Sequence, residues 1–399
     1  MIATPERELC IRTRFSVAKA LFLDVFAKDL RGVGIWASAT VSDRSLVFRA
    51  SLRKPPPDKL ITSLRVIRKN RLRTNWTLID RLQRNGVACQ FARGATLNLD
   101  SISPAIEVCT TKEQRDLFDF CRVMQAVPAQ RLLYRRMAFL VRDVGQPNRP
   151  LIGVLGLSSM VYSLACRDAF LHWNEDGRTS VKEWGINRCM QLSVCMPIPP
   201  YNYLRAGKLL AALALGSDVA AEFATRYSRS STPEHLLGIL TSSANGLHSP
   251  IFTRIMVRPG GLFRRIGATL GYTALPYGKP TVDAARALVR KKDGVCYENR
   301  AIRTLKRALN ICGVPREFFV TLGIPKGVYW GAPDNGATEA LRTRDVDYAP
   351  TYPSRETIVQ FWQKHVQKAV ARPDVLAAVR RFEPANCRAT QSRGLWDAV

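Results

Sequence analysis

The residues best suited to bind an anion lie where a predicted strand turns into a predicted helix. Residues 190–196 are apolar and of strand length, residues 197–202 form a Pro-rich turn, and residues 203–213 are rich in Ala and Leu. The first turn of a helix has free backbone N–H groups that attract anions. We therefore predict a cofactor-binding set made of Asn202, Arg205, Gly207 and Lys208. The alternative is that Gly207 only permits close helix–strand packing and that Lys208 is solvated.

A second group of polar residues follows the apolar run that ends at Thr241. Hydroxyls, an amide and an imidazole are concentrated in residues 241–250, and α/β sheets place ligands at such strand–helix junctions. A Gly-rich segment, 264–273, adds a tyrosine. The candidate catalytic residues are Ser242, Ser243, Asn245, His248 and Tyr272. Ser249 with Pro250 is also typical of a helix cap, and a single His is more often structural than catalytic.

The common catalytic and metal-binding motifs are absent from the sequence. Gly207-Lys208 does not complete a phosphate-binding loop, because Asn202 and Leu209 stand where that loop needs Gly and Ser or Thr. The patterns GxSxG, HExxH and GxGxxG are missing. The ten cysteines form no CxxC pair, so we predict no metal site and expect reduced thiols.

The charge balance is strongly positive and points to a polyanionic partner. The 399 residues include 60 Lys+Arg against 32 Asp+Glu, a net charge of +28. Nucleic acid, DNA or RNA, is the partner that this balance favours. Basic residues are dense in 52–94 and 282–307, where the alternative is a solvated helix face. The residues predicted to contact phosphates are Arg65, Arg68, Lys69, Arg71, Arg73, Arg290, Lys291, Lys292, Arg303 and Arg307.

Hydropathy gives no sign of a membrane or secreted protein. No run of about 18 apolar residues occurs, and the N-terminal residues lack the pattern of a secretion signal. We therefore expect a cytoplasmic protein with no membrane partner.

The alternation of short apolar runs with helical stretches predicts an α/β (α+β) fold. We expect a central mixed or antiparallel sheet flanked by helices, with basic helical extensions at both ends. The expected regions are a basic, mostly helical segment 1–98, a linker 99–112, an α/β core 113–280 and a helical basic segment 281–399. Thr110-Thr111 is a predicted helix cap at the start of the core. The dipeptide Arg167-Asp168 is typical of a surface or interstrand salt bridge.

An ordered set of short motifs resembles the DruA family, the A component of the Druantia anti-phage defence system. The matching pieces are Leu117-Phe118, residues 135–143 and 150–156, Arg167-Asp168, Trp173, residues 199–202, 207–209 and 241–254, Gly267 and residues 271–273. The resemblance covers about 104–370, and residues 1–95 match little. It implies a defence or mobile-element context, with a helicase-like or nuclease-like partner protein.

The family is in turn similar in element order to GNAT-type N-acyltransferases, which implies a GNAT-like core and coenzyme A or an acyl-CoA as a cofactor. The acyltransferase turn pattern is Q/R-x-x-G-x-G/A, and Arg205 and Gly207 do not keep its spacing. Two functions follow. The first is a nucleic-acid-binding defence component without chemistry of its own. The second is an acyltransferase that modifies a nucleic-acid base, a tRNA or a protein, in which Arg205, Gly207 and Lys208 hold the donor phosphates.

Overall fold

The computed structural model describes residues 8–52, 65, 68–69, 71–125, 134–228, 234–244, 246–269, 277–295, 301–321 and 325–384. The chain divides into two compact units. Unit 1 comprises Met1–Asn70 and Leu270–Lys326, and unit 2 comprises Arg71–Thr269 and Gly327–Val399. Residues 270–326 are thus an insertion into unit 2, and they complete a unit that the N-terminal residues begin.

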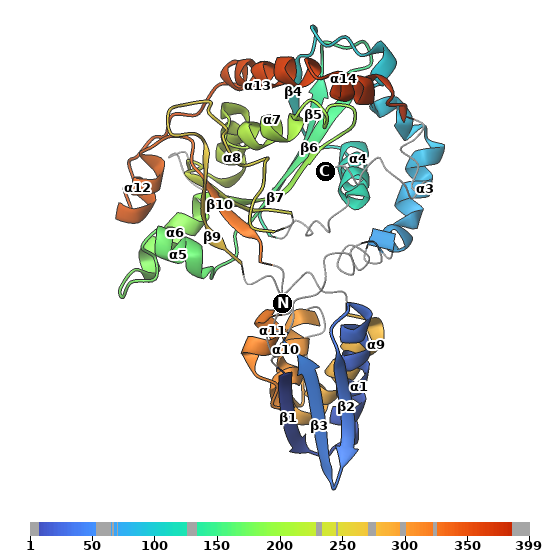
Figure 1. The fold of residues 1–399 in the computed structure, drawn as a ribbon. Helices are drawn as coiled ribbons and strands as arrows, with labels where there is room; N and C mark the ends of the chain where they lie inside the picture. Colours follow the sequence, from blue (N-terminus) through green and yellow to red (C-terminus); the bar gives the residue numbers. More distant parts are fainter. Residues whose placement is uncertain are drawn as a thin grey trace, which may run out of the picture. The chain divides into compact units, whose positions relative to one another are not determined.

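Unit 2 is built on a seven-stranded sheet with the order β4-β5-β6-β7-β8-β10-β9 (Figure 1). The strands are β4 (Pro104–Val108), β5 (Arg136–Asp143), β6 (Leu151–Ser158), β7 (Cys189–Pro197), β8 (Gly238–Ser242), β9 (Phe263–Ala268) and β10 (Gly327–Gly331). Neighbours pair antiparallel except β7 and β8, which run parallel. This parallel pair joins only Cys189–Gln191 to Gly238–Leu240, after which β7 continues to Pro197 without β8 as a partner.

Helices cover both faces of this sheet. The helices and 3-10 turns of unit 2 are α3 (Trp76–Arg84), η1 (Val87–Gln90), η2 (Gly94–Thr96), α4 (Lys112–Met124), α5 (Ala165–Phe170), α6 (Thr179–Asn187), α7 (Ala206–Leu213), α8 (Ser217–Tyr227), α12 (Ala337–Thr343), α13 (Arg355–Val370) and α14 (Pro373–Arg380). α7 is buried between β7 and α13, because Leu209, Leu210 and Trp362 share one apolar cluster. α4 packs on the sheet through a different cluster that includes Phe118 and Val194.

Unit 1 has a three-stranded antiparallel sheet with the order β1-β3-β2. Its strands are β1 (Glu8–Arg14), β2 (Ala37–Ser42) and β3 (Ser45–Ser51), and its helices are α1 (Val17–Gly32), α9 (Lys279–Asp293), α10 (Ala301–Ile311) and α11 (Arg316–Thr321). One face of the sheet packs on these helices around Phe22, Phe26 and Phe48. Asp29 ties α1 to the start of α9 by accepting hydrogen bonds from Gly278 N at 2.8 Å and Thr281 Oγ1 at 2.6 Å.

The structure confirms the predicted α/β class and differs from the expected regions in three places. β4 lies within 99–112, which we expected to be a linker. Residues 1–98 contain the three strands of unit 1 in addition to helices such as α1 and α3, and residues 281–399 supply β10 to the sheet of unit 2. β4 is a five-residue edge strand that begins with Pro, and such a strand leaves little alternation in the sequence.

The pair Arg167-Asp168 is an internal contact rather than a surface one. Arg167 is fully buried, and its Nε donates to Asp168 Oδ1 at 2.9 Å. The same guanidinium donates to the carbonyl oxygens of Val161 and Tyr162 and lies 5.3 Å from the ring centre of Trp173. Each of the three guanidinium nitrogens thus has an acceptor, which offsets the cost of burying this charge.

Candidate anion-binding site

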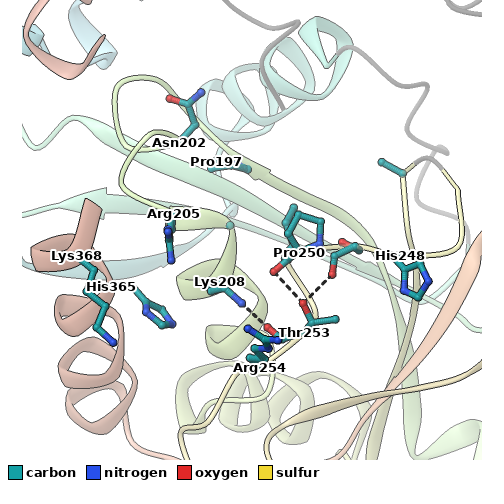
Figure 2. Close-up of a pocket in the computed structure, with 14 residues that line it drawn as sticks. Pro197, Asn202, Arg205, Lys208, His248, Pro250, Thr253, Arg254, His365 and Lys368 are labelled. Atoms are coloured by element: carbon teal, nitrogen blue, oxygen red, sulfur yellow. Dashed lines mark hydrogen bonds between the residues drawn. The ribbon is translucent and has the colours of Figure 1, made fainter. Parts of the chain in front are cut away.

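A cavity of about 1130 Å³ lies in unit 2 where β7 and β8 no longer pair. Three segments line it: the end of β7 with the turn into α7, the loop after β8, and one turn of α13 (Figure 2). The lining residues are Pro197, Asn202, Arg205, Gly207, Lys208, Ala244, His248, Ser249, Pro250, Ile251, Thr253, Arg254, His365 and Lys368. The cavity therefore gathers residues that are up to about 170 positions apart in the chain.

Two buried contacts fix the elements that carry these side chains. Tyr201 Oη in the turn after β7 donates to the buried Asp143 at 2.8 Å. Asp143 also accepts from the backbone N–H groups of Ser103, at 2.8 Å, and Gly145, at 3.1 Å, while burial raises the pKa of its carboxyl. Trp362 Nε1 on α13 donates to the Leu204 carbonyl at 2.9 Å, which holds α13 against the start of α7.

The cavity wall is positively charged. Arg205, Lys208, Arg254 and Lys368 line it, and no described lining residue is acidic. Cations gathered around a concave, partly dehydrated space focus a positive potential into it. This lining therefore favours a negatively charged ligand.

Lys208 is half-buried in this wall and contacts the loop after β8. Its Nζ donates to the Thr253 carbonyl, and Thr253 Oγ1 donates in turn to the Ser249 carbonyl at 3.2 Å. Burial, then the charges of Arg205 and Arg254, lower the pKa of Lys208 to about 8. The ammonium lacks a carboxylate partner among the described residues, so a bound anion would supply the missing charge.

His365 offers an uncharged imidazole in the same space. It lies one turn of α13 from Phe361, with the two ring centres 4.8 Å apart and edge-on. Both ring nitrogens are buried and have no hydrogen-bond partner in the described part of the chain. Burial, followed by Lys208, Arg205 and Lys368, lowers the pKa of His365. A neutral imidazole has one N–H donor and one acceptor available for a ligand.

Two of the cavity arginines have an uncommon backbone conformation. Arg205, which precedes α7, has φ 58°, and Arg254 has φ 56°, both in the left-handed region. A non-Gly residue there carries strain, and such residues gather at functional sites. Figure 2 shows the side chains of Arg205, Lys208 and His365 directed into a common space. The backbone at Arg205 and Arg254 therefore adopts a strained conformation at the cavity into which these side chains point.

The four predicted cofactor-binding residues all line the cavity. Asn202 Oδ1 is buried without a partner among the residues described, and Gly207 packs against the loop after β8. A Cβ at position 207 would lie 3.1 Å from Ile251 Cγ1, so a larger residue would press on the cavity wall. Both predicted interpretations of Gly207 thus agree with its position.

The candidate catalytic residues are not gathered in this way. His248 lines the cavity, whereas Ser242 ends β8 and is not a lining residue. Ser243 is buried, and its Oγ accepts from Gly327 N at 2.9 Å and donates to the Gly246 carbonyl. These bonds give Ser243 a structural role. Asn245 and Tyr272 lie outside the described residues.

The residues predicted to contact phosphates are distributed over both units. Arg65, Lys69, Arg73, Arg290, Lys291, Lys292 and Arg303 are exposed, and Arg68, Arg71 and Arg307 are half-buried. Arg71 donates to the Gln125 carbonyl, and Arg307 forms an ion pair with Asp293 at 2.7 Å. Arg71 and Arg73 belong to unit 2 and the others to unit 1.

Sequence reasoning missed the three remaining titratable residues of the lining, Arg254, His365 and Lys368. Arg254 stands in a segment that we singled out for its hydroxyls. His365 and Lys368 belong to a helix whose clearest signal is its apolar stripe, and nothing in the local sequence connects them to α7. The packing of α13 on α7, which includes the Trp362–Leu204 hydrogen bond, places them at the cavity.

Metal and membrane features are absent where the structure can be described. No group of three His, Cys, Asp or Glu among the described residues could hold a metal ion. No described helix is long and apolar enough to cross a membrane. No disulfide joins the eight described cysteines, and burial raises the pKa of Cys109, Cys189, Cys195 and Cys312 to about 12.

Fold and cavity together define an α/β protein with a cation-lined cavity. Comparison with known proteins gives the family. The model of the family described as Druantia protein DruA matches residues 62–291, more than half of the chain. The chain belongs to this DruA family.

A curated relative, Druantia protein DruA from Escherichia coli (strain UMEA 4076-1), is 30% identical over 269 residues. The match covers 63% of this chain and 65% of the relative, so the chain spans less than two thirds of that protein. No solved structure matches the chain.

Proposed function

We propose that this chain is a DruA-type component of a bacterial anti-phage defence system and that it binds nucleic acid. The observation that carries the proposal is the cavity wall, with four cationic side chains and no acidic one among its described residues. The net charge of +28 supports it, since phosphate neutralisation supplies most of the affinity of non-specific nucleic-acid binding. In this proposal the protein acts in the cytoplasm with other proteins of the system, such as a helicase.

The size and layout of the cavity suit an extended polyanion better than one small ion. Its volume of about 1130 Å³ far exceeds that of one phosphate group. Its cations come from three separate segments, so they can contact successive phosphates of one strand. His365 and Asn202 add uncharged hydrogen-bonding atoms, which a base or sugar can use.

The test is the salt dependence of binding, measured by fluorescence anisotropy with a labelled 20-nucleotide strand and the full-length chain. The logarithm of the affinity should fall linearly with the logarithm of salt, with a slope of about −0.7 per phosphate contact on a single strand. Lys368→Gln should weaken binding and reduce the slope by about one contact. Lys364→Gln removes an exposed charge of the same helix that does not line the cavity, and it is the control. Salt-insensitive binding, or equal slopes for both variants, would contradict the proposal.

A second candidate function is acyl transfer from coenzyme A or an acyl-CoA. It is favoured by one observation: the whole predicted cofactor set lines a cavity at the point where β7 and β8 separate. Arg205, Gly207 and Lys208 would then hold the donor phosphates, and His248 would move a proton of the acceptor, which is a base, a tRNA or a protein.

Native mass spectrometry of the purified chain separates the two functions. A bound mass equal to coenzyme A or an acyl derivative, lost in Lys208→Ala, would support acyl transfer. Heterogeneous nucleic acid that is removed by salt would support the first function.

A further inference from the structure

The outward face of the three-stranded sheet in unit 1 carries an unpaired basic surface that the cavity does not use. Alternate residues of a strand point to opposite faces. Ile11, Phe48 and Ala39 belong to the cluster shared with the helices, so their strand neighbours point away from it.

The strand register fixes which outward residues are neighbours. Arg49 on the central strand lies between Cys10 of β1 and Ser38 of β2. The next outward row is Arg12, Val47 and Thr40, and the last is Arg14, Ser45 and Ser42. Successive outward residues of one strand lie about 7 Å apart, and neighbouring strands about 5 Å. The three arginines therefore form one cluster, which we call the sheet surface, together with the hydroxyls of Ser38 and Thr40. The Ser42 hydroxyl donates to Asp43 Oδ2 at 3.3 Å.

The arginines of this surface are free for a ligand. Arg12, Arg14 and Arg49 are exposed, and their guanidinium groups have no ion pair or hydrogen bond within the described residues. Arg44, in the turn between β2 and β3, adds a fourth exposed cation. The acidic residues of these strands and their turn are Glu8, at the start of β1, and Asp43. The three strands and this turn thus carry four arginines against two acidic residues.

An exposed tryptophan stands at one end of the sheet surface. The Trp36 carbonyl accepts from Ser51 N at 2.9 Å, which continues the register of β2 by one residue. Trp36 therefore points to the same, outward face of the sheet as Ser38. Its side chain is 52% exposed. An indole of this exposure on a polar, basic face offers a surface on which a base can stack.

We propose that the sheet surface binds single-stranded nucleic acid, an inference that rests on the proposed function. Arg12, Arg14 and Arg49 contact phosphates, the hydroxyls of Ser38 and Thr40 donate further hydrogen bonds, and Trp36 stacks on an unpaired base. A single strand fits this surface better than a duplex, because duplex bases are stacked on each other and do not offer a face to an indole.

The test uses the full-length chain and a fluorescein-labelled 20-nucleotide strand, alone or annealed to its complement, in an anisotropy titration. Arg12→Gln with Arg49→Gln should weaken single-strand binding at least tenfold. The matched control is Lys28→Gln with Lys279→Gln, which removes two exposed charges from helices of the same unit and should change binding less than twofold. Trp36→Ala should weaken binding of the single strand at least fivefold and binding of the duplex much less. Circular dichroism should show that all variants are folded.

The outcomes separate this inference from the function on which it rests. Absence of binding by the unaltered chain would overturn the proposed function itself. Salt-dependent binding that both double variants weaken equally, or that neither weakens, would leave the proposed function standing and overturn the sheet surface. Equal losses for single strand and duplex in Trp36→Ala would overturn the assignment to a single strand. Recovery of binding in Arg12→Lys with Arg49→Lys would show that charge is the property that matters.

Discussion

Replacing Lys208 by Met should weaken anion binding without weakening the fold. Met keeps most of the unbranched side chain and removes the ammonium. In the native chain this ammonium is half-buried, faces Arg205 and Arg254, and has a pKa lowered to about 8. A cation at a cavity wall whose charged form is disfavoured by burial and by neighbouring cations is typical of a site that binds an anion.

The expected loss of affinity follows from one charged contact. A hydrogen bond to a charged group contributes about 1.5–3 kcal/mol, and the partial exposure of Lys208 places its contact at the low end. About 1.4 kcal/mol corresponds to a tenfold change in Kd. Lys208→Met should therefore bind a labelled single strand about tenfold more weakly at pH 7.

The pH dependence has a defined sign. Below about pH 8 the folded chain carries the Lys208 proton, and above it the ammonium and its contact with the anion are lost. Native-chain affinity should therefore fall between pH 7 and pH 9.5, whereas this fall should be absent in Lys208→Met. Stability follows the opposite course. The unfolded chain keeps the proton up to about 10.5, so the cost of burying the ammonium is full below about pH 8 and is relieved above it.

Two measurements on the same preparations check this reasoning. Anisotropy titrations at constant ionic strength give the Kd at each pH, and urea unfolding gives the free energy of unfolding at pH 7. The lost bond to the Thr253 carbonyl offsets part of the relieved charge cost, so the unfolding free energy should change by no more than about 1 kcal/mol. A flat native-chain profile across pH 7–9.5, or a variant with the native Kd, would refute the account of Lys208.

Four further predictions follow from the same structure. Lowering the pH should protonate His365 and strengthen anion binding. Because the pKa of His365 is lowered in the folded chain, acid should also reduce the free energy of unfolding. Both effects should shrink in His365→Gln when Kd and urea unfolding are measured from pH 7 to pH 5. Arg205→Gly should relieve the strain of the left-handed backbone and raise the unfolding free energy by about 0.5–1 kcal/mol relative to Arg205→Ala, while both variants should lose the same amount of binding affinity. Equal unfolding free energies for the two variants would contradict the strain at position 205. Ser243→Ala should cost about 1 kcal/mol of stability and leave Kd unchanged, whereas loss of binding in a stable variant would restore a functional role. Arg167→Ala should destabilise by about 3 kcal/mol, since it removes the donors to the Val161 and Tyr162 carbonyls and leaves the buried Asp168 with Lys182 as its remaining ion-pair partner. Arg265→Ala, at an exposed position of β9, is the control.

The anion site was predictable in part because one half of it is local in sequence. The turn after β7 and the first turn of α7 are consecutive, so Arg205, Gly207 and Lys208 reveal their proximity by spacing alone. The same holds for α4, where the predicted Thr111 cap accepts from Gln114 N at 3.2 Å. Such features depend on backbone groups within one turn of each other.

The part of the site that α13 and the loop after β8 contribute could not be predicted from local sequence. His365 is polar, half-buried and on a helix that the sequence marks by its apolar stripe, and the same pattern occurs in helices that line no cavity. The hydroxyl-rich loop after β8 illustrates the opposite case, in which a residue predicted to be catalytic makes structural contacts. Ser243 uses its side chain to bond the backbone of Gly246 and Gly327. Polar residue type alone does not separate a ligand group from a backbone brace.

The sequence by itself determined the excess of positive charge, the α/β class and the local geometry at the start of α7, since these depend on composition, periodicity and neighbouring residues. Tertiary structure alone decided that residues 270–326 join β1, β2 and β3 in a separate unit, and that α13 completes the cavity beside α7. The physical reason is that apolar burial is non-directional and acts between segments far apart in the chain. Which two apolar faces meet, and which polar groups they bring together, is settled only when the whole core packs.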